Sequence, residues 1–538
     1  MTNPISRRLS EIAQQAKSSG LRDTFSSNPN RAEQYTYSMN GLTLDLSKTH
    51  ISDEMLESYA QMAEEVGLAE KRHAMFSGEP INLTEDRAVL HSMLRESEPQ
   101  QIGVSKQHLS IEAKTAKQNL MDMVEQVQRR LNSDSESITD LIHVGIGGSA
   151  LGPQLLFEAL KSLDSKIKIH FIGNIDGHQI ASVLSECNPV TSLIFGVSKT
   201  YTTEETLTNL LTLKAWCEDG LRDQKSSSGS FESRFYAITA NASNALQFGV
   251  NAQNLLVFPE WVGGRYSVWS GVSLAVVAVL GWDKFNQLLE GAEAIDREFL
   301  KYGLKENPAF VLAALDHFYV NHFNAGSRAT FAYDFRLRSL VPYLQQLEME
   351  SNGKDRDLNG DPVCTPTAPV IWGGVGTDMQ HSTFQFLHQG THFVPIELIV
   401  VKKADHSFSV HHRKLLSNAI GQSAALLEGR SEAQLSDSLD NTQPLDATQR
   451  SRLFSGNRPS STFVIDELSA RHFGSLIALY EQRTFCFGVL SKINSFDQMG
   501  VELGKQLASQ IEPLMSGGAG IEEFDGSTLN LLSACSNT

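Results

Sequence analysis

The sequence predicts an α/β protein with mainly parallel sheets that carry helices on both faces. Short β-rich runs alternate with helical segments between about residues 122 and 285, the pattern of a parallel sheet with crossover helices. A second α/β stretch follows, up to about residue 512. The chain of 538 residues is too long for one ordinary core, and its 41% hydrophobic content is that of a globular protein. Two or three domains are therefore expected.

Residues 1–121 are expected to form a helical segment that packs on the second domain. Ser52 is a predicted N-cap with acidic residues in the first turn after it, and Thr84 is predicted to start another helix in the same way. No strand pattern stands out in this part of the sequence.

The first α/β domain is predicted over residues 122–285. Its expected strands are "TDLIHVG" (139–145), "KIKIHFIG" (166–173), "TSLIFGVS" (191–198), "RFYAITA" (234–240) and "NLLVF" (254–258). The longest apolar run, "VSLAVVAVLGW" at 272–282, is well short of the roughly 20 residues that a membrane span needs, so a buried helix is expected there.

The second α/β domain is predicted over residues 286–512, and residues 513–538 are expected to form a tail or arm. The expected elements of this domain are helices near 309–323, 342–350, 378–389 and 496–512, and the strand "VPIELIVVKK" at 394–403.

Charge and cysteine usage exclude several classes of protein. The net charge of −17 argues against nucleic acid or an anionic membrane as partner, so any anion site must be local. The five cysteines are far apart and form no CxxC pair, which fits a reducing, cytoplasmic setting. The N-terminal residues have two arginines without an apolar run behind them, so a secretory signal is not expected.

A glycine-rich turn joins the first predicted strand to a helix in "LIHVGIGGSALGPQLLFEAL". Gly145 and Gly147 satisfy a loose dinucleotide fingerprint, with Asp176 beyond the next strand where a ribose-binding acid would stand. The backbone N–H groups around Gly148 and the Ser149 hydroxyl would equally well hold a phosphate monoester. A structural turn without a ligand is the third interpretation.

A second strand-to-helix junction, in "TSLIFGVSKTYTTEETLTNLL", carries Ser198, Lys199, Thr200 and Thr203. Four hydroxyl or ammonium donors at one junction indicate a phosphate cradle, with Lys199 as its point charge. A hydroxyl-rich N-cap is the alternative, but capping needs neither Lys199 nor Ser198. Two adjacent junctions that donate to one phosphate fit a small sugar phosphate better than a dinucleotide.

Two further segments carry candidates for proton transfer at a carbon atom. Arg265 precedes a buried helix, where a guanidinium suits a developing oxyanion; a surface arginine after a Gly-Gly turn is the alternative. Glu350 falls in the last turn of the predicted helix 342–350. The negative end of this helix disfavours the ionised carboxylate, which would raise the pKa of Glu350 and make it a better base. A solvated acid at the helix end is the alternative. Gln346 lies one turn earlier on the same face.

Histidines and a polar stripe complete the candidates. Asp378 is a predicted N-cap with His381 in the first turn, where the positive helix end favours a neutral imidazole that can move protons. His381, His388 and His392 share a helical face, but no acidic ligand joins them, so no metal site is expected. Gln498, Glu502 and Lys505 form one polar stripe, which usually means a solvated face.

Seven segments together resemble the glucose-6-phosphate isomerase family, in its order and over roughly residues 45–512. They are "FSGEPINLTEDRAVLH", "VGIGGSALGP", "SKTYTTEETLTN", "WVGGRYSVWS", "MESNGK", "GTDMQHSTFQFLHQGT" and "FDQMGVELGKQ". The resemblance implies reversible interconversion of glucose 6-phosphate and fructose 6-phosphate, without metal or cofactor, in glycolysis and gluconeogenesis. It also implies two αβα domains of the sugar-isomerase (SIS) type and a homodimer with active sites at the interface.

The resemblance assigns a role to each candidate residue by its position. The phosphate would be held by Gly148, Ser149, Ser198, Lys199, Thr200 and Thr203, and the sugar chain by Gln346 and Gln498. His381 and Lys505 would open the sugar ring. Glu350 would carry a proton between C1 and C2 through a cis-enediol, with Arg265 stabilising the enediolate. The family places the residue that matches His381 across the dimer interface, so an isolated subunit is expected to be inactive.

Three other functions stay open from the residues alone. A non-catalytic sugar-phosphate sensor would keep the phosphate cradles but has no use for Glu350, His381, Lys505 and Arg265 together. A nicotinamide dehydrogenase would need the loose glycine fingerprint to be real. A metal-dependent aldose–ketose isomerase that transfers hydride would be sensitive to chelators.

Overall fold

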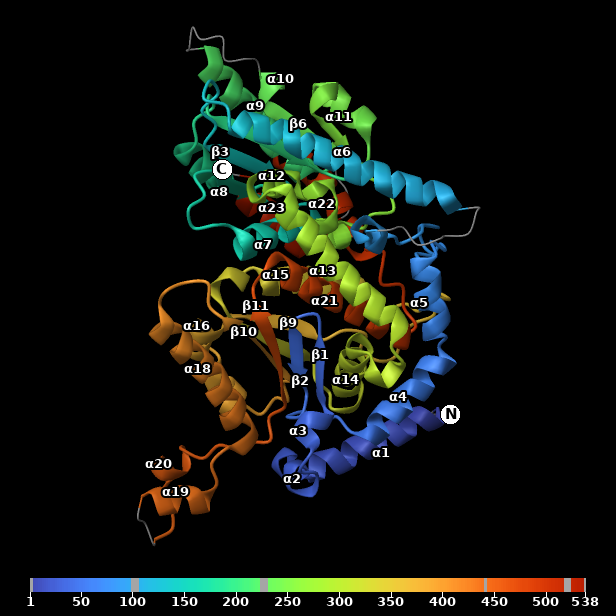
Figure 1. Ribbon diagram of the computed structural model, residues 1–538, viewed down its shortest axis with the longest axis vertical. Helices are drawn as coiled ribbons and strands as arrows, with labels where there is room; N and C mark the ends of the chain where they lie inside the picture. Colours follow the sequence, from blue (N-terminus) through green and yellow to red (C-terminus); the bar gives the residue numbers. More distant parts are fainter. Residues whose placement is uncertain (1–2, 98–105, 223–230, 440–442, 517–523, 537–538) are drawn as a thin grey trace. The chain divides into compact units, whose positions relative to one another are not determined.

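The computed structural model describes residues 3–97, 106–222, 231–439, 443–516 and 524–536 (Figure 1). The chain divides by its contacts into two compact units, residues Met1–Ser495 and Phe496–Thr538. The first unit contains both sheets.

The first sheet confirms all five predicted strands. It is parallel throughout, in the order β4-β3-β5-β6-β7. The strands are β3 (Asp140–Val144), β4 (Lys168–Ile172), β5 (Ser192–Val197), β6 (Phe235–Thr239) and β7 (Leu255–Val257). β4 and β5, the two strands that follow β3 in the chain, pair with opposite edges of β3. The carboxyl ends of β3 and β5 are therefore a topological switch point, where open α/β sheets bind ligands.

Helices cover both faces of the first sheet (Figure 1). Side chains of α8 and α9 join Ile142, Val144 and Phe235 in one buried apolar cluster, and α12 packs against α6. The helices of this region are α6 (Gln107–Leu131), α7 (Leu151–Leu160), α8 (Gly177–Glu186), α9 (Glu204–Arg222), α10 (Phe231–Arg234), α11 (Ala242–Phe248) and α12 (Leu274–Leu280). The apolar run at 272–282 is thus a buried helix, as predicted.

The second sheet has the order β1-β2-β11-β10-β8-β9. Four strands are parallel to one another: β8 (Ser327–Tyr333), β9 (Val370–Val375), β10 (Ile396–Lys403) and β11 (Ser460–Glu467). The predicted strand at 394–403 is β10. Residues Ala329, Phe331 and Tyr333 of β8 face an apolar cluster that includes α17 and α18. Arg328, which directly precedes Ala329, belongs to the opposite face by the same alternation.

The expectation that residues 1–121 contain no strand is wrong. β1 (Thr36–Met39) and β2 (Leu42–Asp45) form an antiparallel hairpin, and β2 adds to the second sheet with Leu44 opposite Phe463. Asn40 and Gly41 form the two-residue loop, both with positive φ, at +33° and +78°. Asn-Gly between alternating apolar residues is a strong hairpin signal, and it was missed because the flanking helical patterns dominate this region.

Most of the remaining helices surround the second sheet. α13 and α14 both pack against α21, which is buried along nearly its whole length. The helices are α1 (Pro4–Ser18), α2 (Leu21–Ser27), α3 (Arg31–Gln34), α4 (Asp53–Glu65), α5 (Leu68–Phe76), α13 (Trp282–Lys301), α14 (Pro308–His322), α15 (Leu340–Leu344), α16 (Gly376–Gln380), α17 (Phe384–Gln389), α18 (Ser409–Glu428), α19 (Glu432–Ser438), α20 (Ala447–Arg450) and α21 (Ala470–Leu490).

Two helix predictions need correction, whereas the Ser52 cap of α4 is confirmed. No helix begins at Thr84, because its hydroxyl bonds Asn82 Oδ1 at 3.2 Å within a turn, and a 3-10 helix, η1 (His91–Arg95), follows. The helix predicted at 378–389 is two short ones, α16 and α17. Asp378 lies inside α16 rather than capping it, because that helix already begins at Gly376.

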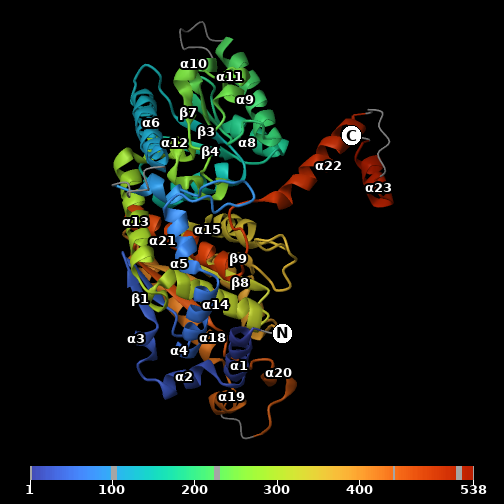
Figure 2. The same cartoon turned by 90° about the vertical axis from the view of Figure 1, so that its right-hand side faces the viewer.

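The second unit contains η10 (Met499–Val501), α22 (Glu502–Met515) and α23 (Gly526–Cys535), at the red end of the chain in Figure 2. The predicted final helix therefore starts later than residue 496. Asp525 caps α23, because its carboxylate accepts from the N–H groups of Ser527 and Thr528.

The three predicted domain boundaries, after residues 121, 285 and 512, fall inside α6, α13 and α22. Each of these points lies within a continuous helix. The four-part division stays a proposal. Among the described residues, no helix has the length and hydropathy required to cross a membrane.

Candidate active site

The two predicted phosphate junctions lie side by side at the switch point of the first sheet. The glycine turn follows β3, the Ser198–Thr203 turn follows β5, and the two strands are paired directly. A Cβ atom placed on Gly145 would lie 3.0 Å from the carbonyl oxygen of Val197. Both turns can therefore donate to the same ligand.

The glycine turn owes its shape to two glycines. Gly147 has a φ of +57°, and a Cβ atom on Gly148 would lie 2.2 Å from the carbonyl carbon of Gly264. Ser267 donates its hydroxyl to the Gly148 carbonyl at 3.2 Å. Because Gly148 has no side chain, the segment that carries Arg265 approaches the turn closely.

His143 supports this turn from inside the sheet and was missed by sequence reasoning. Its Nε2 lies 2.6 Å from the carbonyl oxygen of Ser149. Burial lowers the pKa of His143 to about 4, so the imidazole is neutral and donates from Nε2. The signal in the sequence is a histidine inside an apolar run, between Ile142 and Val144.

The second junction brings two hydroxyls together. Ser198 Oγ lies 3.0 Å from Thr203 Oγ1 and accepts from the Tyr201 N–H at 3.1 Å. The Thr200 hydroxyl pairs with Thr202 instead, at 2.7 Å, on the exposed side of the turn. Ser198 and Thr203 thus form the inner part of this junction, and Thr200 the outer part.

Lys199 links the second junction to the Arg265 segment. Its Nζ donates to the carbonyl oxygen of Val262 at 3.1 Å. Burial lowers the pKa of Lys199; the positive charges of Arg87 and Arg265 act in the same direction, and Glu85 and Glu260 oppose them. Lys199 and Arg265 thus place two cations beside the turns, where they can attract an anionic ligand.

Arg265 is buried, with 3% of its surface exposed, which excludes the surface-arginine interpretation. It belongs to the 3-10 helix η5 (Gly264–Trp269). Nε donates to Ser351 Oγ at 2.6 Å, and Nη2 donates to the Ser495 carbonyl at 2.7 Å. Nη1 lies 3.7 Å from Glu350 Oε2, so a fixed cation faces this carboxylate.

Glu350 and Gln346 lie on a π-helix, η9 (Gln345–Glu350), that continues α15. The Glu350 side chain is 23% exposed, so it is only partly solvated. Glu350 Oε2 and Gln346 Oε1 are buried and have no hydrogen-bond partner among the described residues. Gln346 Nε2 reaches to 3.0 Å from the Cβ position of Gly147. Buried polar atoms normally have partners, so the hydroxyls of a bound ligand fit here.

Three predicted site residues come from other parts of the chain than this cluster. His381 is exposed at the C-terminal end of α16, so the argument from a positive helix end does not apply to it. Gln498 and Lys505 belong to the second unit, where Lys505 Nζ lies 3.1 Å from Glu502 Oε1. Asp176, the candidate ribose ligand, caps α8 instead by accepting from the His178 N–H at 2.9 Å.

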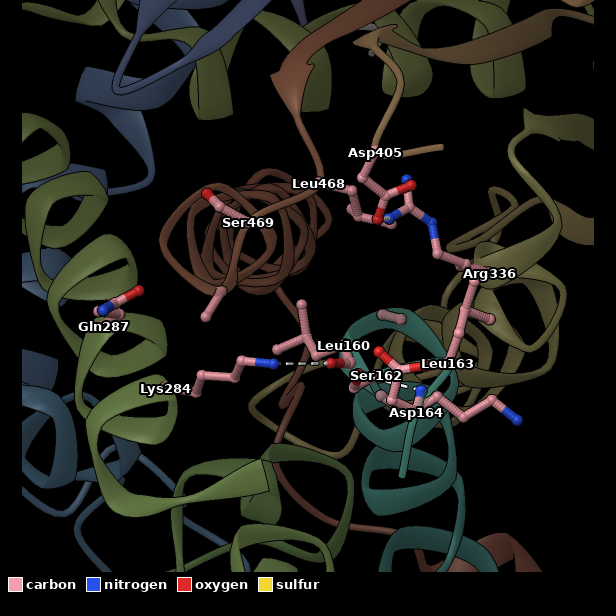
Figure 3. Close-up of a pocket in the computed structure, with 13 residues that line it drawn as sticks. Leu160, Ser162, Leu163, Asp164, Lys284, Gln287, Arg336, Asp405, Leu468 and Ser469 are labelled. Carbon is pink, nitrogen blue, oxygen red and sulfur yellow. Dashed lines mark hydrogen bonds and ion pairs between the residues drawn. The ribbon is translucent and has the colours of Figure 1, made fainter. Parts of the chain in front are cut away.

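A separate pocket of about 440 Å³ contains none of the predicted site residues (Figure 3). Two of its three lining cations have polar partners: Arg336 pairs with Asp334 and Asp405, and Lys284 donates to the Leu160 carbonyl at 3.4 Å. The third, Lys161, lies over the Phe157 ring, 5.5 Å from its centroid. The pocket is therefore distinct from the candidate active site.

Asp140, His170 and Cys187 are the described residues that place metal-ligand atoms within 4.8 Å of one another. His170 Nε2 lies 2.8 Å from Asp140 Oδ1, whereas two ligands on one zinc ion would stand about 3.4 Å apart. The trio is thus a hydrogen-bonded pair beside a thiol, at the opposite end of β3 from the glycine turn.

Comparison with known proteins assigns this arrangement to a family. The family model for phosphoglucose isomerase matches residues 45–532. The chain belongs to the phosphoglucose isomerase family. Glucose-6-phosphate isomerase 1 of Chromobacterium violaceum is 39% identical over 525 residues, which are 96% of this chain and 95% of that protein. The enzyme of Shewanella loihica is 40% identical over 506 residues, 93% of this chain and 92% of its own.

The fold is shared with a solved member of the phosphoglucose isomerase family. A crystal structure of glucose-6-phosphate isomerase from Chlamydia trachomatis has a TM-score of 0.83 and 30% identity, over 99% of each chain. The predicted class, mixed α/β with mainly parallel sheets of the sugar-isomerase type, is confirmed.

Proposed function

We propose that this chain interconverts glucose 6-phosphate and fructose 6-phosphate by ring opening and proton transfer through a cis-enediol, as a step of glycolysis and gluconeogenesis. The observation that carries the proposal is the pair of Glu350 and Arg265. A carboxylate oxygen without a hydrogen-bond partner lies 3.7 Å from a buried guanidinium, at the edge of a site with two anion-binding turns.

The chemistry needs both members of this pair. A C–H proton next to a carbonyl is weakly acidic, so its removal requires a positioned base and stabilisation of the enediolate oxygen. Glu350 carries the proton between C1 and C2, and Arg265 stabilises the enediolate charge. The reaction moves a proton within the sugar and leaves its overall oxidation state unchanged, so it needs no redox cofactor; we propose that Arg265 supplies the charge stabilisation and that no metal takes part.

The phosphate is held where the two turns meet. Ser149, Ser198 and Thr203 supply hydroxyls, Gly148 supplies its backbone N–H, Lys199 supplies charge, and Thr200 closes the outer side. Gln346, which lies over the glycine turn, holds the sugar chain between the phosphate and Glu350, together with Gln498.

The ring-opening step is assigned to His381 and Lys505. They move a proton between O1 and the ring oxygen, so that the open-chain sugar reaches Glu350. Because His381 is exposed in its own chain, we propose a homodimer in which His381 completes the site of the partner subunit. Leu503 and Leu507, one turn apart on α22 and both exposed, are consistent with a chain that buries further apolar surface on association. We place the dimer in the cytoplasm, with neither nucleic acid nor membrane as partner.

Deuterium labelling tests the proposed reaction. Wild-type protein incubated with fructose 6-phosphate in D₂O is expected to form glucose 6-phosphate with deuterium at C2, because the carboxylate exchanges its proton with solvent. EDTA is expected to have no effect, and NMR of the product reads the label. Unlabelled product, or activity lost to EDTA, would indicate hydride transfer on a metal. The absence of isomerisation would favour the sugar-phosphate sensor. An absorbance change on adding NAD(P) with the substrate would favour the dehydrogenase.

Mixing two inactive variants tests the dimer. His381→Asn and Glu350→Gln homodimers are each expected to be inactive, but a heterodimer has one intact site, formed by Glu350 of one subunit and His381 of the other. Random subunit exchange should therefore restore about one quarter of the wild-type activity. A mixture of the His381→Asn and Lys199→Gln proteins serves as the exchange control. Mass spectrometry shows whether the two subunits have combined in mixed dimers of the same size as the wild-type dimer. Exchange without recovery, or a dilute monomer with full activity, would contradict the shared site.

A further inference from the structure

We propose that a buried ionic network centred on Arg328 and Arg483 positions the π-helix η9, and that Glu348 is the positioning residue through which it acts on Glu350. The inference rests on the function proposed above and extends it to residues outside the substrate site.

The segment to be positioned is an uncommon one. π-Helices, with their i→i+5 hydrogen bonds, are rare and usually short, and they occur frequently at functional sites. η9 places Gln346 and Glu350 towards the site. Glu348 lies two residues from each, and is therefore directed to the other side of the helix, where it is 6% exposed.

Glu348 is held by Arg328, a residue of β8 in the second sheet. Arg328 Nη2 donates to Glu348 Oε1 at 2.6 Å, and Nη1 donates to Asp316 Oδ2 at 2.9 Å. One guanidinium thus ties η9 to α14 and to the rigid sheet. The Arg328 side chain is 3% exposed, so water does not compete for these bonds.

Arg483 of α21 extends the network. It donates to both oxygens of Asp316, at 2.7 and 2.9 Å, and to Glu397 Oε2 of β10 at 2.6 Å. Tyr480 donates its hydroxyl to the same Glu397 carboxylate. Two cations and three carboxylates are therefore packed together, and each is fixed by at least one other member.

The same helix reaches the segment that carries Arg265. Glu481 of α21 accepts from Trp269 Nε1 of η5 at 2.8 Å. The Thr484 carbonyl accepts from Asn352 Nδ2 at 3.0 Å, and Asn352 lies directly after the π-helix region. α21 thus contacts both segments of the Arg265–Glu350 pair, which explains how residues so far apart in the sequence keep one geometry.

A positioning role predicts a selective loss of activity. A displacement of about 1 Å at a reacting group can cost roughly 100-fold in rate. Loss of the Glu348 carboxylate leaves Arg328 Nη2 without its acceptor and lets η9 shift, which impairs proton transfer at C2. Ring opening, assigned to His381 and Lys505, does not use Glu350 and should continue.

The experiment compares the two steps in one protein. Isomerisation is measured as kcat at saturating fructose 6-phosphate, and ring opening as the rate at which the α and β anomers interconvert, by exchange NMR. Glu348→Ala is expected to lower isomerisation about 100-fold while anomer interconversion changes less than about threefold. Glu348→Gln keeps an oxygen that accepts from Arg328, and is expected to recover most of the lost rate.

Two further variants keep the test decisive. Glu293→Ala removes another buried carboxylate, on α13, that pairs with Arg297 at 2.6 Å and takes no part in the network. It should leave the ratio of the two rates unchanged. Arg328→Lys, which cannot reach Asp316 and Glu348 together, should reproduce the selective loss if Glu348→Ala does not fold.

If Glu348→Ala and Arg328→Lys leave the ratio of isomerisation to anomer interconversion unchanged, whether both rates fall equally or neither falls, the positioning role is overturned. Failure of Glu348→Gln to recover activity above Glu348→Ala would do the same. A wild-type protein without isomerase activity would instead refute the proposed function, so the two failures are distinguishable.

Discussion

Glu350→Gln is expected to lower the kcat for isomerisation by about 10⁴-fold and to abolish deuterium incorporation at C2. Glutamine has nearly the same shape as glutamate but cannot accept the proton that moves between C1 and C2. The protein should fold normally, because Arg265, the charged partner of Glu350 at 3.7 Å, keeps its hydrogen bonds to Ser351 and Ser495.

NMR of fructose 6-phosphate in D₂O, with and without the variant, checks this expectation. Two controls accompany it. Anomer interconversion should persist, since ring opening does not need Glu350. Glu293→Gln, a substitution of a buried carboxylate outside the site, should label C2 at the wild-type rate. A Glu350→Gln protein that still labels C2 at that rate would show that another group is the base.

The second large effect is expected for Arg265→Lys. Removal of one preorganised donor from a site of developing negative charge typically costs 10²–10³ in kcat, or about 3–4 kcal/mol. Lysine keeps the positive charge but cannot donate to the Ser351 hydroxyl and the Ser495 carbonyl while also facing Glu350, as the planar guanidinium does. The cost is therefore one of orientation rather than of charge.

Arg265→Lys is also expected to lower stability, because it leaves buried acceptors without a donor, at about 1–3 kcal/mol. Steady-state kinetics and thermal unfolding measure the two effects separately. Arg297→Lys, on a guanidinium whose side chain is 65% exposed, should change neither quantity measurably. A kcat within a few-fold of wild type in a folded Arg265→Lys protein would rule out the oxyanion role.

The first sheet could be predicted strand by strand because its signal is local. Parallel strands buried on both faces are short continuous apolar runs, and helical segments separate them in the sequence. The second sheet was harder. The local pattern predicts only β10, and β2 pairs with β11, more than 400 residues later in the chain. Local sequence patterns do not predict a pairing between segments so far apart.

The failures in the helices have a physical cause as well. Thr84 has the residue type of an N-cap, but its hydroxyl bonds the Asn82 side chain in a turn. The pattern at 378–389 is helical throughout, yet the chain turns at His381 between α16 and α17. Propensity states what a segment can form, and contacts with the rest of the protein select among those conformations.

The sequence by itself determined the α/β class, the strands of the first sheet, and the two donor-rich turns, because those features depend on neighbouring residues. It left Arg265 and Glu350 each with a surface alternative. Only the tertiary structure decided the matter, since the burial of Arg265 and its 3.7 Å approach to Glu350 arise from η5, η9 and α21 packing together. The charge and reactivity of a side chain depend on how much water surrounds it and which groups face it, and both are set by residues distant in the chain.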